Sequence, residues 1–173
     1  MNKYAKEISL LGVLTALYVA LCVVSWPLAY GPFQFRIAEV LIVLPFYNKK
    51  YSIAVILGTF IANLIGPFGI VDAVVGSAAS AIVCLIIITA KNKLAIAPAA
   101  AVINGLIIGA MIYILDAVGD PLAGIAIAGS VAFGVFAVVL AGVLAFTGLE
   151  RTNPRIIVMI KDMKIAKNES QKV

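Results

Sequence analysis

The stretch YSIAVILGTF IANLIGPFGI VDAVVGSAAS AIVCLIIITA, residues 51–90, decides the fold class. It carries a single charged residue, Asp72. A membrane-spanning helix needs about 20 predominantly apolar residues, so this run is too long for one span. The sequence Gly-Pro-Phe-Gly at 66–69 marks a turn and divides the run into two predicted spans, 51–65 and 70–90.

The composition of the whole chain has the same character. Of its 173 residues, 64% are apolar and 12% are charged, compared with roughly 45–50% and about 25% in soluble domains. The mean hydropathy is +1.14. A soluble domain of this size could not bury so much apolar surface. The composition therefore predicts an all-α integral membrane protein, with a single membrane domain over residues 1–173.

The few charged residues separate further apolar runs, which bring the predicted number of transmembrane helices to six. The spans outside residues 51–90 are expected near 8–29, 33–47, 94–115 and 121–149. The first apolar run is longer than the 7–15 residues usual in a signal peptide, so we expect it to be retained as a helix. Cys22 and Cys84 fall inside spans and are expected to be buried as small apolar residues.

The basic residues give the orientation of these spans. With six helices, only Arg36 of the 13 Lys and Arg residues falls on one side of the membrane, and all the others fall on the opposite side. Lys and Arg are enriched in cytoplasmic loops, so both termini are expected to be cytoplasmic. Residues 150–173 are expected to form an amphipathic cytoplasmic tail against anionic lipid. The net charge of +5 is thereby explained by topology, without a nucleic-acid partner.

Catalysis is not expected from this sequence. The chain contains no His, which excludes His-based acid–base chemistry and His-ligated metals. It also has no phosphate-binding Gly-Lys-Ser/Thr loop, so uphill transport would need an ion gradient or partner subunits. We expect no enzyme activity, no cofactor and no metal site.

The segment after the first span is the candidate binding loop. It combines the aromatic residues Tyr30, Phe33 and Phe35 with the polar residues Gln34 and Arg36. Aromatic faces stack on flat rings, and the amide and guanidinium groups supply hydrogen-bond donors. This combination predicts a loop able to cover a flat polar molecule.

Three polar residues near the outer ends of spans extend this candidate site. Glu39 shares a helix face with Arg36 if the segment is helical, and the two either bind a ligand or only pair with each other at the water boundary. Asp72 either accepts hydrogen bonds from a ligand or stabilises the start of its helix. Asn63 is a candidate through its place beside the Gly-Pro turn. Asp116 and Asp120 are expected to be solvated loop residues.

Small residues recur every four positions on the first helix, at Gly12, Ala16 and Ala20. Such a strip lets another helix approach closely, and internal packing is the simpler explanation. Gly105 and Gly109 have the same spacing and the same simple explanation. Asn104 is expected to form a hydrogen bond between helices.

Several of these motifs resemble the QueT family. The most characteristic is GPFQFRIAEVL at 31–41, which continues to Leu-Pro-Phe at 44–46. The strings Ala-Asn-Leu at 62–64 and Asp-Ala-Val-Val-Gly at 72–76 also match, and the resemblance covers roughly residues 8–150. QueT proteins are substrate-binding S components of energy-coupling factor (ECF) transporters.

This resemblance implies a function and a set of partners. An S component sits in the plasma membrane of a prokaryote and docks on a transmembrane T component coupled to two cytoplasmic ATPases. S components carry an Ala-x-x-x-Ala strip for that docking, which Ala16 and Ala20 match. The family name implies a queuosine precursor of deazaguanine type as substrate. The same polar groups would suit an aminopyrimidine vitamin precursor such as hydroxymethyl pyrimidine.

Two other classes of function are compatible with the sequence. A stand-alone secondary transporter would use an intramembrane carboxylate as a proton carrier, and only Asp72 and Glu39 qualify, both near the outer edge. A non-transporting membrane scaffold would bind no small molecule.

Overall fold

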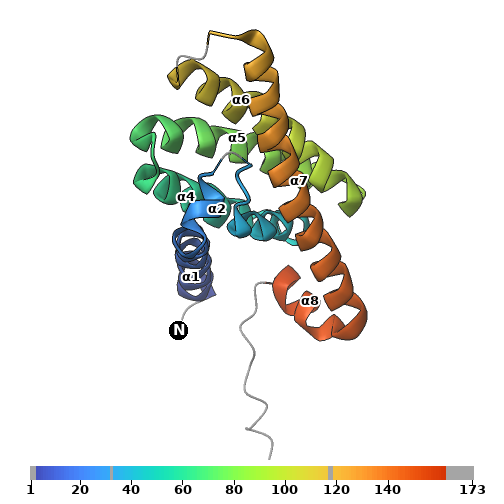
Figure 1. The fold of residues 1–173 in the computed structure, drawn as a ribbon. Helices are drawn as coiled ribbons and strands as arrows, with labels where there is room; N and C mark the ends of the chain where they lie inside the picture. Colours follow the sequence, from blue (N-terminus) through green and yellow to red (C-terminus); the bar gives the residue numbers. More distant parts are fainter. Residues whose placement is uncertain (1–2, 32, 117–118, 163–173) are drawn as a thin grey trace, which may run out of the picture.

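The computed structural model describes residues 3–31, 33–116 and 119–162 and is built from helices (Figure 1). Within these ranges there is no strand, so the predicted all-α class is confirmed. The elements are, in chain order, α1 (Lys3–Val24), α2 (Trp26–Ala29), the 3₁₀-helix η1 (Ile37–Val43), α3 (Leu44–Tyr47), α4 (Tyr51–Ile65), α5 (Gly69–Thr89), the 3₁₀-helix η2 (Lys93–Ala95), α6 (Ile96–Leu115), α7 (Pro121–Thr152) and α8 (Pro154–Asp162).

Four helices in the described residues are long and apolar enough to cross a membrane. They cover Tyr4–Val24, Gly69–Thr89, Lys93–Leu115 and Pro121–Thr152. The apolar helices Ile37–Tyr47 and Tyr51–Ile65 are shorter. At 1.5 Å per residue, the 15 residues of α4 reach about 22 Å, less than the roughly 30 Å of a hydrocarbon core.

The structure departs from the predicted helix bounds on both sides of the candidate binding loop. The first predicted span, 8–29, is interrupted at Ser25, between α1 and the single turn of α2. The second, 33–47, becomes helical only at Ile37. Gln34 has φ +45°, a left-handed conformation that helices do not contain, so the chain turns here before η1 begins.

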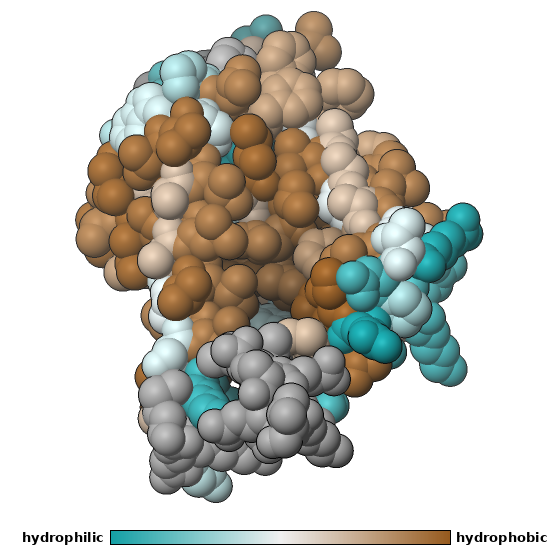
Figure 2. All heavy atoms as spheres, turned by 90° about the horizontal axis from the view of Figure 1, so that it is seen from below, coloured by the Kyte–Doolittle hydropathy of each residue, from teal (hydrophilic) through white to brown (hydrophobic). Residues whose placement is uncertain are grey.

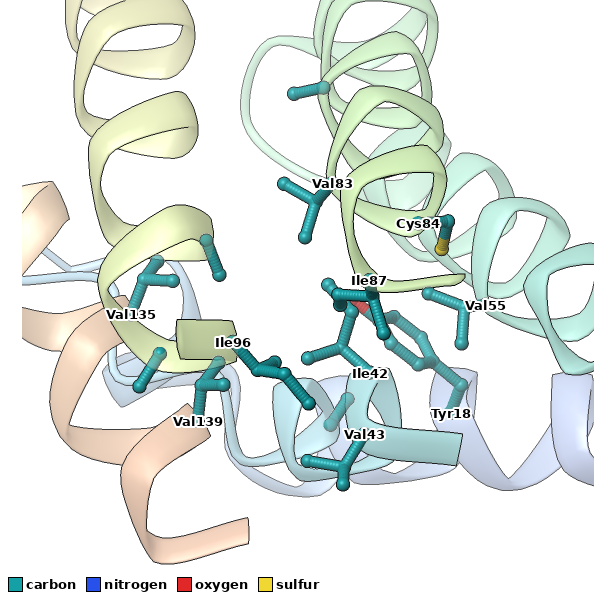
Figure 3. Close-up of a cluster of buried hydrophobic side chains, with 14 of the residues drawn as sticks. Tyr18, Ile42, Val43, Val55, Val83, Cys84, Ile87, Ile96, Val135 and Val139 are labelled. Carbon is teal, nitrogen blue, oxygen red and sulfur yellow. The ribbon is translucent and has the colours of Figure 1, made fainter. Parts of the chain in front are cut away.

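The core is formed where α1, α4, α5, α6, α7 and η1 meet. Figure 3 shows Tyr18 of α1 beside Val55 of α4, Ile42 of η1 and Ile87 of α5. Tyr18 is fully buried, and a Cβ at Gly58 would lie 2.8 Å from the Tyr18 Cβ. The glycine therefore lets α4 approach α1 closely.

Small residues join α6 to α7. A Cβ at Gly105 would lie 2.8 Å from the Ala132 Cβ, and one at Gly109 would lie 2.6 Å from the Ala128 Cα. The spacing of these two glycines therefore serves internal packing, as expected. Asn104 is buried and donates to the Ala100 carbonyl, at 2.9 Å, within α6. The predicted hydrogen bond between helices is thus replaced by one to the preceding turn.

Two glycines of α7 allow close packing of the segment that contains the candidate binding loop. A Cβ at Gly134 would collide with the carbonyl oxygen of Phe33, and one at Gly142 would lie 3.0 Å from the carbonyl oxygen of Val40. Segment 33–43 therefore runs along α7 with its backbone in direct contact with the helix. This contact positions the loop relative to α7.

Ion pairs join helix ends that carry basic residues. Lys50 at the start of α4 pairs with Glu7 of α1, and Lys93 of η2 pairs with Glu150 near the end of α7. Because α6 begins just after Lys93 and α7 ends just after Glu150, this pair fixes the antiparallel helices at one end. Asp120 lies in the loop before α7 and is exposed, as expected, and it also caps this helix by accepting from the Leu122 N–H at 3.0 Å.

Helix α8 packs beneath the start of α4. The Tyr51 hydroxyl donates to the Ile160 carbonyl at 2.9 Å, and the Asn48 amide donates to the Lys161 carbonyl at 2.7 Å. Ile157 is buried against the rest of the molecule. Of the predicted tail, 150–173, residues 163–173 lie outside the described residues.

The surface is strongly apolar. Figure 2 shows apolar side chains over most of one face, with hydrophilic residues at several of its edges. The exposed large apolar side chains include Val13, Leu85, Ile114, Leu122 and Ile125. Soluble monomers rarely expose apolar patches this extensive, so this is the surface of a membrane protein. Cys22 and Cys84 are buried free thiols, as expected for small apolar residues.

Candidate functional site

A cavity of about 370 Å³ lies where three parts of the chain meet. These parts are the loop after α2, the turn between α4 and α5, and the facing ends of α6 and α7. Its volume is within the roughly 300–1,000 Å³ of small-molecule sites. The lining residues are Tyr30, Gly31, Gln34, Pro67, Phe68, Asp72, Ile112, Asp116, Ile127 and Ser130.

Asp72 is the acidic group on the α5 side of this cavity. It lies in the first turn of α5 and is buried. The Asn63 amide of α4 donates to the Asp72 carbonyl oxygen at 3.0 Å and to its Oδ1 at 3.1 Å. Gly76 leaves room for this amide, because a Cβ there would collide with Asn63 Nδ2. Asn63 thus orients the carboxylate without contributing to the cavity wall.

Tyr30 and Gln34 form the loop side of the cavity. The Tyr30 hydroxyl donates to the Ala62 carbonyl of α4 at 2.6 Å, which joins the loop to α4. The left-handed backbone at Gln34 brings its amide to the cavity. Gln34 and Asp72 thus offer an amide and a carboxylate, which suit a flat ring bearing N–H and carbonyl groups.

Arg36 and Glu39 lie behind the cavity wall. The Arg36 Cζ is 5.2 Å from the centroid of the Tyr30 ring, in the range of a cation–π contact. Glu39 accepts from the Tyr18 hydroxyl at 2.9 Å through Oε1. Both side chains are more than nine-tenths buried, and Arg36 Nε and Glu39 Oε2 have no hydrogen-bond partner among the described residues. The two side chains thus belong to a buried polar layer beneath the loop.

The remaining loop aromatics do not line the cavity. The Phe35 ring contacts Phe33 and the edge of Phe133, each with centroids 6.1 Å apart. Phe33 is 52% exposed. These side chains fix the loop on α7 in this structure.

The family of the chain follows from its similarity to known proteins. A family model described as QueT transporter matches residues 8–151. The chain belongs to the QueT transporter family. The predicted family is therefore confirmed, and the cavity lies within the matched region.

A curated QueT relative gives a second comparison. The chain is 42% identical over 72 residues to the queuosine precursor transporter QueT of Lactococcus lactis subsp. cremoris strain MG1363. That alignment covers 40% of this chain and 42% of the relative, so it spans less than half of either protein. No solved structure matches the chain.

The fold divides the predicted site residues into those that line the cavity and those that lie beside it. Of the predicted substrate-binding residues, Tyr30, Gln34 and Asp72 line the cavity. Arg36, Glu39 and Asn63 are buried beside them, and Phe33 and Phe35 lie on the α7 side of the loop.

Two residues of this candidate site were not predicted from the sequence. Asp116 follows α6 and is exposed, as expected of a loop residue, but it also lines the cavity. Tyr18 holds Glu39 but lies in an uninterrupted apolar run. The signal in the sequence was a tyrosine among aliphatic residues, because a buried tyrosine hydroxyl needs a hydrogen-bond partner such as the Glu39 carboxylate.

The small-residue strip of α1 is open in the structure. Gly12, Ala16 and Ala20 are exposed, and a Cβ at Gly12 would meet no atom of the described residues within 4 Å. The opposite face of α1 carries Tyr18 and Cys22 into the core. In this QueT chain the strip is thus unused by internal packing among the described residues.

Proposed function

We propose that this chain is the substrate-binding subunit of an ATP-driven ECF-type importer and that it captures a queuosine precursor of deazaguanine type from outside. It crosses the plasma membrane six times, with both termini cytoplasmic. A transmembrane T component and two cytoplasmic ATPases are its partners. The observation that carries the proposal is the cavity lined by Tyr30, Gln34 and Asp72 inside the region matched by the family.

The chemistry of the cavity supports a guanine-like ligand. The Asp72 carboxylate can accept two hydrogen bonds from adjacent N–H groups, as a guanine-type edge presents. The Gln34 amide can donate to a ring carbonyl and accept from an N–H group. The name of the Lactococcus lactis relative points to the same ligand class.

The distribution of charge supports the orientation. Basic residues lie at the end of the molecule opposite to the cavity. They include Lys6 in α1, Lys50 before α4, Lys93 before α6 and Arg151 at the end of α7. By the positive-inside rule that end is cytoplasmic, so the cavity faces outward. An outward cavity suits a subunit that captures its ligand before transport.

The exposed strip on α1 supports a partner subunit. Gly12, Ala16 and Ala20 would let a helix of the T component approach the α1 backbone closely. Ala16→Trp should abolish co-purification of the partners and leave ligand binding intact. Leu17→Trp is the matched control, because Leu17 is exposed on α1 outside the strip. Unchanged co-purification with both variants would contradict the docking role.

The decisive experiment is purification of the tagged chain from its native host in mild detergent, followed by mass spectrometry. A bound deazaguanine base together with the T component and ATPases is the expected result. A bound aminopyrimidine would show that the ligand is a vitamin precursor and not a deazaguanine. Proton-dependent uptake by vesicles containing the chain alone would identify a secondary transporter, and the absence of any bound small molecule would favour a scaffold.

A further inference from the structure

Tyr30 contacts both the cavity and Arg36. Its side chain lines the cavity, whereas Arg36 does not. The Arg36 Cζ is 5.2 Å from the Tyr30 ring centroid, and Arg36 is only 7% exposed. The tyrosine ring therefore stands where a ligand would have to be for the guanidinium to reach it.

A small set of contacts holds the Tyr30 ring in this place. Its hydroxyl donates to the Ala62 carbonyl at 2.6 Å. The ring lies against Gly66, where a Cβ would be 2.8 Å from Tyr30 Cε1, and against Trp26, whose ring centroid is 4.6 Å away. Only the first contact is a hydrogen bond, so one directional interaction sets the rotation of the side chain.

The Arg36 guanidinium beneath the Tyr30 ring does not make all the hydrogen bonds it can donate. Arg36 Nε is buried and has no hydrogen-bond partner in the part of the chain that the structure describes. No carboxylate of the described residues lies within 4.0 Å of its nitrogens. An aromatic face attracts the charge but accepts no strong hydrogen bond. Buried donors without acceptors are unfavourable, so a carbonyl oxygen would be a better partner than the Tyr30 ring.

We propose that Tyr30 is a movable cover over Arg36. A ligand entering the cavity displaces the Tyr30 ring, and its ring carbonyl then accepts hydrogen bonds from the guanidinium. Arg36 is thereby a specificity-determining residue for carbonyl-bearing rings, and Tyr30 is a positioning residue. The ligand part rests on the proposed function, whereas the shielding of Arg36 stands without it.

Arginine-directed modification with phenylglyoxal tests the shielding without ligand. The chain has only three arginines, and Arg151 and Arg155 are exposed, so they are internal references in peptide mass mapping. In the wild-type chain, Arg36 should react much more slowly than the references. Tyr30→Ala should raise its rate to theirs.

Tyr30→Phe separates the hydroxyl contact from the ring. It keeps the aromatic face and removes the hydrogen bond to Ala62, so Arg36 should react about two- to tenfold faster, the scale of one neutral hydrogen bond. Tyr113→Phe is the control, because Tyr113 packs against Gly124 away from Arg36. Equal Arg36 rates in the wild type and Tyr30→Ala would overturn the shielding.

Binding of two probes tests the role of Arg36. Arg36→Gln should weaken binding of 7-deazaguanine about 10- to 100-fold, as expected for a charged hydrogen bond. It should leave binding of 2-amino-7-deazapurine, which lacks the ring carbonyl, nearly unchanged. An equal loss for both probes would overturn the assignment. If the wild-type chain binds neither probe, the proposed ligand is wrong, while the modification rates still decide the shielding.

Trp26 reports the movement directly. It is the only tryptophan of the chain, and it packs on the Tyr30 ring. Saturating 7-deazaguanine should change its fluorescence in the wild type. The change should be much smaller in Tyr30→Ala, where no ring can leave. An identical change in both proteins would contradict displacement of Tyr30.

Discussion

Replacing Gly134 by alanine should displace the segment that carries Gln34 and Arg36. The added Cβ would collide with the carbonyl oxygen of Phe33 and would lie 2.8 Å from its carbonyl carbon. It would also lie 3.2 Å from the Gln34 carbonyl carbon. These are backbone atoms, which cannot rotate away as a flexible side chain can.

Two opposing effects set the size of the change. Alanine in a helix is favoured over glycine by about 0.5–1 kcal/mol, whereas overpacking a close contact costs about 1–3 kcal/mol. Gly134→Ala should therefore lower the free energy of unfolding by about 1–2 kcal/mol. In a chain of this size that is roughly 2–8 °C in the midpoint of thermal unfolding. Binding of 7-deazaguanine should weaken as well, because the loop side of the cavity moves.

Gly129→Ala is the matched control on the same helix. Gly129 is exposed, and a Cβ there would meet no atom within 4 Å. This variant should gain the helix preference of about 0.5–1 kcal/mol and bind ligand normally. Thermal unfolding and calorimetric titration of both variants in detergent provide the measurements. Equal stability and equal affinity of the two variants would refute the close contact between α7 and the loop.

Three further changes probe the site and its supports. Asp72→Asn should weaken ligand binding by about 1.5–3 kcal/mol, the scale of a charge-assisted hydrogen bond. Calorimetric titration measures this change, and an unchanged affinity would exclude a direct contact between Asp72 and the ligand. Tyr18→Phe should lower the free energy of unfolding by about 1–3 kcal/mol, because the buried Glu39 Oε1 loses its hydrogen-bond donor. An unchanged midpoint of thermal unfolding would show that water replaces the hydroxyl. Lys93→Met removes the ion pair with Glu150, whose side chains are 20% and 30% exposed, and should cost no more than about 1 kcal/mol. A much larger loss in thermal unfolding would mean that this pair carries more than a surface contact.

Much of the helical layout could be predicted from where charges interrupt the apolar runs. The turn at Gly66–Gly69 separates α4 from α5 as expected, because Gly and Pro act locally. The break at Ser25 precedes Pro27 at the start of α2, and the left-handed turn at Gln34 follows Gly31 and Pro32 in the sequence, so both also have a local signal. The contact of segment 33–43 with the glycines of α7 has none, because it is a tertiary contact between residues distant in the sequence.

The candidate site was predictable as a set of residue types but not as an arrangement. The motif places Tyr30 and Arg36 in one loop, yet only the fold shows that one lines the cavity and the other lies behind it. Asp116 joins the cavity because α6 ends beside the start of α7. That proximity follows from the glycine and alanine packing of the two helices, which hydropathy does not report.

The cavity is walled by three segments that are distant in the chain: the loop after α2, the α4–α5 turn, and the facing ends of α6 and α7. A ligand that touches all three acts as a removable cross-link. At a concentration 100 times its dissociation constant it would add about 2.7 kcal/mol to the folded state. The opposite end is held by the chain's own contacts, among them the pair of Lys93 with Glu150 and the hydrogen bonds of α8. The ligand would therefore add rigidity at the cavity end, whereas the contacts at the opposite end do not depend on it.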